Sequence, residues 1–233
     1  MSNISFKLTI KLATPVVMGR LRLTLDGLLS AAIFRKLGLK GESCIPYIPL
    51  EQAGGIFKAS SMFVNEGSHL SHLKLNRIMS LKGLGDLTPD HFLPNSAKGD
   101  RYLSVDQARG PYKSNLSEYS ALNATEVCFY GVGDALAVKE LIDIYITGIG
   151  AQANAGAGQI LSTEIEPLAA GDMSHWVTES GKPARQLPLE VWEGLPDIDD
   201  KFSEGAANIT VRLPYWDTAN LARGVFPTEL THF

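Results

Sequence analysis

A glycine-rich stretch between a helical pattern and a strand pattern constrains this chain more than any other feature. The eleven residues from Gly148 to Gly158 contain two Gly-x-Gly pairs around five small, uncharged residues. An apolar periodic segment, 135–146, precedes the stretch, and an alternating run, 159–166, follows it. Ordering four glycines costs conformational entropy, so packing alone does not predict them. Glycine lets backbone approach a ligand closely, and successive exposed N–H groups bind anions, so the loop predicts a phosphate-rich partner.

Three interpretations of this glycine loop compete. The first is a flexible connection between a helix and a strand. The second is a dinucleotide-binding fingerprint, because the loop begins G-x-G-x-x-A; that motif must follow a strand and open a helix, whereas here a helical pattern precedes it. The third is a loop that holds a nucleic-acid backbone. No G-x-x-x-x-G-K-[ST] sequence occurs, so a Walker-type nucleotide site is not supported.

Composition sets the class of protein. The 233 residues suit one large domain or two small ones, and 45% hydrophobic residues with 20% charged residues are typical of a soluble globular chain. The net charge of −4 argues against a generally basic nucleic-acid binder. Charge is uneven, however: the segment 69–113 carries seven Lys or Arg against four acids, whereas acids dominate 164–204. This distribution allows one basic surface on an acidic body.

Cysteine usage and the N-terminus indicate the compartment. Cys44 and Cys128 are far apart and form no C-x-x-C pair, so we expect buried thiols in a reducing cytoplasm, with neither zinc nor a disulfide. The chain begins directly with a strand pattern, and no segment has the length of a membrane span. We therefore expect a cytoplasmic protein.

The first half of the chain predicts a strand and a helix. Residues 4–12 alternate between apolar and polar, which is typical of a half-buried strand. Asp26 is the expected N-cap of a helix over 27–37, with Gly38 ending it. Two short strands, or a hairpin, are expected at 47–50 and 56–63.

The second half predicts a matching pair of strands around a helix. A strand is expected over 125–131, and Asp134 caps the helix that follows. The expected core residues of that helix are Leu136, Val138, Leu141, Ile142 and Tyr145. After the glycine loop comes a strand over 159–166, stopped by Pro167. The order β-α-β, insertion, β-α-β predicts an α+β fold of the ferredoxin-like (RRM-like) type.

Two segments lack this regularity. Residues 65–120 show no sustained periodicity, which indicates a functional or partly disordered insertion. Aromatic residues lie beside cations there, a combination that holds single-stranded nucleic acid, although a solvated loop is the alternative. Residues 168–204 are acidic and rich in Gly and Pro, so we expect them to run over the surface, with Trp176 and Trp192 attaching them to the domain or to a partner. A further strand at 207–213 and a docked aromatic tail complete the chain.

With these residues in view, the chain resembles the RAMP superfamily of CRISPR effector subunits. Their mark is a ferredoxin-like domain with a G-x-G…G-x-G loop just before its last strand, as here. Within that superfamily it is most similar to the type IV effector subunit of Cas group five. That similarity is carried by the opening strand and by residues 14–17, 25–29, 49–55, 59–60 and 214–216. The resemblance implies a RAMP domain over 1–167 with a thumb-like basic insertion at 65–120, and an irregular extension, 168–233, packed on it.

The resemblance also implies a noncatalytic role. Such subunits bind the 5′ handle of a CRISPR RNA (crRNA) and cap one end of a filament of backbone subunits. A large subunit lies alongside, the assembly pairs its guide with target DNA, and in type IV it recruits a DinG-type helicase. No cofactor, metal or membrane is expected.

One departure from the family pattern matters for the site. Related loops often carry Arg or Lys between the glycine pairs, whereas this one has Gln152 and Asn154. Phosphate binding would then depend on backbone N–H groups and these amides, with cations from the insertion. The expected RNA-binding residues are Gly148, Gly150, Gln152, Asn154, Gly156, Gly158, Arg20, Arg22, Lys74, Arg77, Lys82, Arg101, Tyr102, Arg109, Tyr112 and Lys113.

Enzymatic functions are the alternatives to this noncatalytic role. Related handle-processing ribonucleases use a general acid–base, often His, on the same scaffold, and His69 and His72 are the candidates here. Two histidines alone make a weak metal site. No G-x-S-x-G or H-E-x-x-H sequence occurs. A small-molecule module that uses the glycine loop is a third class, but it lacks a convincingly placed acidic partner for a ribose.

Overall fold

The chain divides into two compact units in a computed structural model. One unit comprises residues 1–71 and 121–233, and the other comprises 72–120. The structure describes residues 3–19, 22–65, 67–77, 92–95, 99–105, 115–169 and 175–227. The expected division at residue 167 stays a prediction.

An antiparallel four-stranded sheet forms the centre of the first unit. Its strands follow the order β11-β1-β10-β5. Their bounds are β1 Ile4–Leu12, β5 Phe63–Val64, β10 Glu126–Gly133 and β11 Ile160–Pro167. Alternation along β1 leaves Phe6, Leu8 and Ile10 fully buried. The expected mixed helix-and-sheet fold is confirmed, and β1 has the bounds that its period-two pattern predicts.

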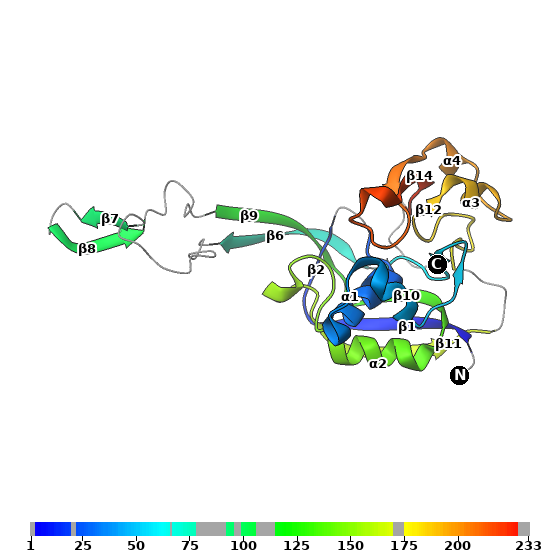
Figure 1. Cartoon of the computed structure of the whole chain (residues 1–233), viewed down its shortest axis with the longest axis horizontal. Coiled ribbons are helices and arrows are strands. Elements are labelled where there is room, and N and C mark those ends of the chain that lie inside the picture. The colour runs from blue at the N-terminus through cyan, green and yellow to red at the C-terminus, as the bar shows by residue number, and fades with distance from the viewer. Residues whose placement is uncertain are drawn as a thin grey trace. The chain divides into compact units, whose positions relative to one another are not determined.

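Two helices pack side by side on one face of this sheet (Figure 1). They are α1, Leu25–Leu37, and α2, Ala135–Tyr145. Gly38 ends α1 in the left-handed conformation with φ 73°, as predicted, and Asp134 caps α2 by accepting a hydrogen bond from the Ala137 amide at 3.1 Å.

Two predictions about these helices are wrong. Thr24, not Asp26, is the N-cap of α1: its hydroxyl accepts a hydrogen bond from the Gly27 amide at 3.2 Å. Asp26 lies inside the first turn and is buried, where it forms an ion pair with Arg185. Leu136 is 77% exposed and lies outside the core, since it faces away from the sheet on the first turn of α2.

Short elements connect α1 to the sheet and replace the two strands predicted there. The segment Gly41–Tyr47 is a 3-10 helix, so the strand expected at 47–50 is wrong. The strand expected at 56–63 is interrupted: β3 Gln52–Ala53 pairs with β4 Ile56–Phe57, and only Phe63–Val64 joins the sheet as β5. The interruption places the buried residues Ser60 and Ser61 between the two pieces.

The segment 65–120 contains strands, although its sequence shows no sustained periodicity. They are β6 His69–Arg77, β7 Phe92–Asn95, β8 Gly99–Val105 and β9 Asn115–Asn123. β7 pairs with β8, and β9 lies between β6 and the short strand β2, Val16–Val17. The expectation of a segment without elements is therefore wrong for these residues, which pair across strands.

The C-terminal part folds into a small subdomain around a second core. Its sheet has the order β12-β14-β13, formed by Leu187–Pro188, Leu221–Val225 and Ala207–Thr210. Two short helices, α3 Leu189–Glu193 and α4 Lys201–Glu204, join these strands. Trp192 is fully buried, and the Trp176 indole N–H donates to the Phe57 carbonyl at 2.8 Å. Of the two alternatives expected for Trp176 and Trp192, the structure shows attachment to the domain, because both side chains are buried within the fold. No described helix is long and apolar enough to cross a bilayer.

Candidate nucleic-acid interface

The glycine loop closes on itself before it meets any other element. Ile149 donates its amide to the Gly158 carbonyl at 2.9 Å, and Ile160 donates to Thr147 at 3.0 Å. These bonds form a neck between the end of α2 and the start of β11. Within the loop, Ala153–Ala155 form a single 3-10 turn.

The loop then docks on the segment before and within β2. The Ala151 amide donates to the Val17 carbonyl at 2.9 Å, and the Gly158 amide donates to Pro15 at 2.8 Å. The Thr14 hydroxyl donates to the Gly156 carbonyl at 2.7 Å. Several amides are thus occupied inside the protein. The expectation that the whole loop presents bare N–H groups is wrong for residues 149, 151 and 155–160, whose amides donate within the chain.

Close packing explains two of the four glycines. A Cβ at Gly158 would lie 2.1 Å from the Ile149 carbonyl oxygen, and one at Gly150 would lie 2.6 Å from that of Val17. Both residues also have positive φ, at 59° and 81°. The expectation that packing is not the reason for the glycines is therefore wrong at these positions. At Gly156, with φ 90°, a Cβ would meet nothing within 4 Å.

The exposed part of the loop is its tip. Asn154, Ala155 and Gly156 are exposed, and Gln152 is half-buried with a left-handed φ of 60°. Gly148 and Gly158 are buried. Of the loop residues expected to bind RNA, the tip and Gly150 are therefore the ones that a ligand can reach.

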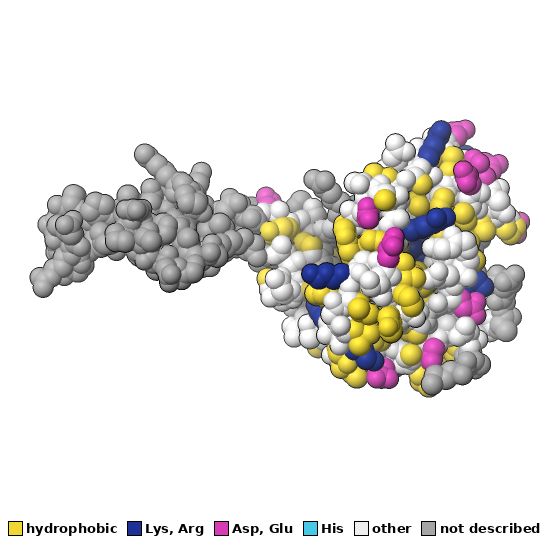
Figure 2. Space-filling view, viewed as in Figure 1, with side chains coloured by type: hydrophobic (Ala, Val, Ile, Leu, Met, Phe, Trp, Pro, Cys, Tyr) yellow, Lys and Arg dark blue, Asp and Glu magenta, His cyan; other side chains and the backbone are white. Residues whose placement is uncertain are grey.

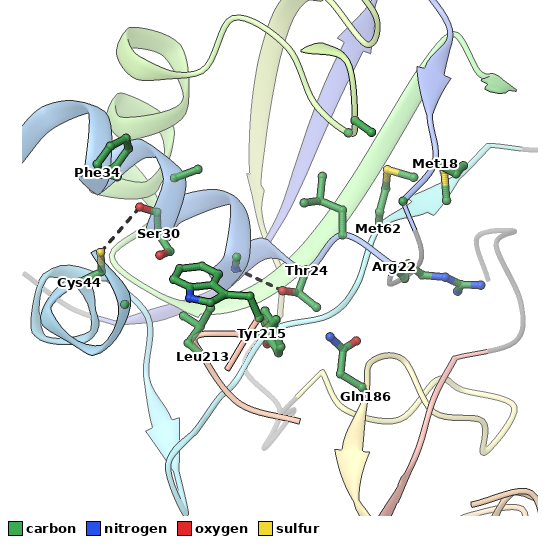
Figure 3. A pocket seen from close by; sticks show the side chains of 18 of the residues that line it. Met18, Arg22, Thr24, Ser30, Phe34, Cys44, Met62, Gln186, Leu213 and Tyr215 are labelled. Carbon is green, nitrogen blue, oxygen red and sulfur yellow. Dashed lines mark hydrogen bonds between the residues drawn. The ribbon is translucent and has the colours of Figure 1, made fainter. Parts of the chain in front are cut away.

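An apolar pocket of about 450 Å³ lies beside the docked loop (Figure 3). Gly150 and Ala151 line it on the loop side, and α1 lines it through Ser30 and Phe34. Its remaining walls come from residues within 16–19, 22–24, 39–44 and 213–216, with Gly27, Ala31, Met62 and Gln186. Among the described residues that line it, Arg22 and Lys40 are the charged ones. The pocket is thus an apolar cleft beside the glycine loop, with Arg22 and Lys40 in its lining.

A buried ion pair supports the wall of this pocket, and the sequence gives no signal for it. Arg185 and Asp26 are each 1% exposed, and the guanidinium lies 3.2 Å from the carboxylate. Tyr215 donates its hydroxyl proton to the same carboxylate oxygen at 2.6 Å. Arg185 also donates to the carbonyls of Phe57 and Ala59 at 2.8 and 3.1 Å. The network holds Tyr215, which lines the pocket, at a defined position.

The expected cations are only partly described. Arg22 lies at the pocket, whereas Arg20, Lys82, Arg109, Tyr112 and Lys113 lie outside the described residues. Lys74 and Arg77 are in β6, and Arg101 and Tyr102 are in β8. On the face shown in Figure 2, Lys and Arg side chains are interspersed with Asp and Glu over the described residues.

The described histidines do not form a catalytic arrangement. The His69 Nε2 lies 3.2 Å from the Asn123 side-chain amide nitrogen and shares a hydrogen bond with it. The side chain of His72 is not among those that the structure describes. His175 is buried, with its Nε2 2.8 Å from the Ser5 hydroxyl, and burial lowers its pKa to about 4. Burial likewise raises the pKa of the Cys128 thiol to about 11, and Cys44 and Cys128 are both free and buried, as expected. Among the described residues, no three His, Cys, Asp or Glu side chains gather as metal ligands would.

Comparison with known proteins identifies the family. The chain is similar to one from the "Cryo-EM structure of the Type III-B Cmr-beta bound to cognate target RNA", with 11% identity and a TM-score of 0.39, over 72% of this chain and 62% of that one. No curated protein matches the sequence. The family model "CRISPR type IV associated protein Csf3" matches residues 4–227, almost the whole chain. This protein therefore belongs to the family of the CRISPR type IV associated protein Csf3.

Proposed function

We propose that this chain is a noncatalytic, RNA-binding subunit of a type IV CRISPR ribonucleoprotein. In this role it binds the 5′ handle of the crRNA and caps the backbone filament, which supports guide-directed binding of target DNA. The observation that carries the proposal is the family match over residues 4–227. Large-subunit contact and recruitment of a DinG-type helicase by the assembly belong to the same proposal.

The topology supports a ferredoxin-like interpretation. The antiparallel order β11-β1-β10-β5, with α1 between β1 and β5 and α2 between β10 and β11 along the chain, is the order of the split βαβ unit. In this arrangement the glycine loop lies between the last helix and the last strand, the position at which RAMP subunits carry theirs.

The site supports binding rather than chemistry. An exposed loop tip, an apolar cleft and two cations suit a sugar–phosphate chain with unstacked bases. Aromatic surface in such a groove stacks on bases, and cations beside it meet phosphates. The described histidines, His69 and His175, each pair with a polar side chain and do not form an acid–base pair with one another.

One incubation separates the two functions. The full chain is mixed with end-labelled repeat RNA from a type IV locus, and parallel samples are run on native and denaturing gels. We expect a shifted complex on the native gel and intact RNA on the denaturing gel. RNA cut at one fixed position, with cutting lost in His69→Ala or His72→Ala, would replace the proposal with a processing nuclease; absence of any complex would reject RNA binding altogether.

A further inference from the structure

We propose that the apolar pocket beside the glycine loop holds one unpaired nucleobase of the bound RNA, hydrogen-bonded to the side-chain amide of Gln186. This inference rests on the proposed RNA-binding function and adds the chemical group that the pocket receives. It is carried by a buried donor, an aromatic wall and the sign of the pocket's charges.

The donor is the amide nitrogen of Gln186. The residue is only 3% exposed, yet its Nε2 has no hydrogen-bond partner among the described residues. Its Oε1 lies 3.5 Å from the Ser61 hydroxyl, so the oxygen of the amide is directed away from the ligand and the nitrogen is left over. Figure 3 shows the amide end of Gln186 directed at the pocket. A buried donor without a partner destabilises the protein, and an acceptor in the pocket would remove that penalty.

The walls suit a flat, apolar group. Phe34, Met18 and Leu213 line the pocket with Tyr215, which its hydrogen bonds to Asp26 and Arg185 hold in place. Trp216 also lines the pocket and is 71% exposed, so its indole is available to stack. Every base has a flat face and presents ring-nitrogen or carbonyl acceptors on its edges. A volume of about 450 Å³ falls within the usual range for small-ligand pockets.

The charges favour a nucleotide over an apolar side chain of a protein partner. Among the described residues, the charged ones that line the pocket are both cations, Arg22 and Lys40, and none is Asp or Glu. The Lys40 ammonium lies 5.4 Å from the centre of the Phe34 ring, and both residues line the pocket. A phosphate attached to a base in the pocket would therefore meet positive rather than negative side chains among the described lining residues.

The test compares two pocket variants with a matched control in the full chain. Gln186→Met removes the donor with little change in volume, and Trp216→Ala removes an exposed stacking surface. Gln52→Met makes the same chemical change at an exposed residue in β3, which does not line the pocket. The probes are fluorescein-labelled single-stranded RNAs of about eight nucleotides, within the usual site size, and the same RNAs with one abasic position moved along the chain.

We expect Gln186→Met to weaken RNA affinity by about 3- to 10-fold and Trp216→Ala by at least about 5-fold, with Gln52→Met unchanged. One abasic position should weaken wild-type binding by a similar factor and should have no further effect in Trp216→Ala. Because Trp216 is exposed, its variant remains informative even if Gln186→Met fails to fold.

Three results would overturn the inference. Wild-type affinity in both variants, with RNA still bound, rejects the nucleobase while leaving the proposed function intact. Intact RNA affinity together with lost co-purification of other complex subunits assigns the pocket to a protein side chain. Failure of the wild-type chain to bind any RNA rejects the proposed function and the pocket together.

Discussion

At the residue scale, the glycines of the loop have different physical reasons. Gly158 is buried against the Ile149 carbonyl, whereas Gly156 lies at the open tip. Both have positive φ, so the steric surroundings are the difference between them.

This difference predicts unequal effects of the same substitution. Gly156→Ala should cost about 1 kcal/mol of unfolding free energy, from the left-handed backbone alone. Gly158→Ala should cost well over about 2 kcal/mol, since its Cβ would lie 2.1 Å from a carbonyl oxygen and the loop must shift. Urea unfolding of both variants measures the difference. Equal losses would mean that the neck of the loop yields without resistance.

His175 predicts a pH effect on stability. Burial lowers its pKa to about 4, from an ordinary value near 6.5, so the folded state disfavours the proton that the unfolded chain accepts. Its contribution is therefore complete above about pH 6.5 and is lost as the pH falls toward 4, by up to about 3 kcal/mol. The charged groups that line the same cavity are Lys7, Glu166 and Glu179.

His175→Asn provides the comparison for that effect. Asparagine tolerates the positive φ of 56° at this position and can still bond to Ser5. Between pH 7 and pH 4.5, we expect the unfolding free energy of the wild type to fall relative to that of the variant. Urea unfolding at each pH measures both values. A constant difference across that range would show that His175 is not the group that titrates.

At the scale of elements, the ion pair between Arg185 and Asp26 joins the C-terminal subdomain to the first turn of α1. The two residues are 159 positions apart in the sequence, and both are almost fully buried. Because the two opposite charges face each other in the interior, loss of one partner leaves the second uncompensated.

We expect Arg185→Met to cost about 3–5 kcal/mol, with Asp26 left buried and charged. Adding Asp26→Leu should restore part of that loss, because both charges are then removed. Chemical denaturation of the two single variants and the double variant gives the coupling energy. Strict additivity of the two single effects would contradict a coupled pair.

At the scale of the whole molecule, the net charge of −4 means that the proposed RNA binding would depend on local cations rather than on a general field. Lys40, which lines the pocket, is a candidate for such a cation. Lys40→Ala should therefore reduce the slope of log affinity against log salt by about 0.7, the value for one phosphate contact on a single strand. Lys201→Ala, in α4 and not among the pocket residues, is the control. Equal slopes in all three proteins would place the phosphates elsewhere.

Local patterns predicted the elements that depend on a few neighbouring residues. The alternation of 4–12, the Asp134 cap and the Gly38 terminus of α1 match the structure, because strand period and helix caps are decided within one or two turns of chain. The position of the glycine loop between α2 and β11 was predictable for the same reason.

Other features depended on contacts between distant segments. The sequence predicts Asp26 as a helix cap, whereas in the structure it forms a buried ion pair with Arg185 and accepts a hydrogen bond from Tyr215. Gln186 carries no sequence signal, and its unpaired amide becomes evident only where the segments of α1, β2 and the C-terminus meet around the pocket. By itself, the sequence determined the opening strand, the helix and the strand on either side of the glycine loop, and the family. Tertiary structure decided which polar groups are buried and which buried groups lack a hydrogen-bond partner among the described residues. The reason is that burial depends on what the rest of the chain places around each group.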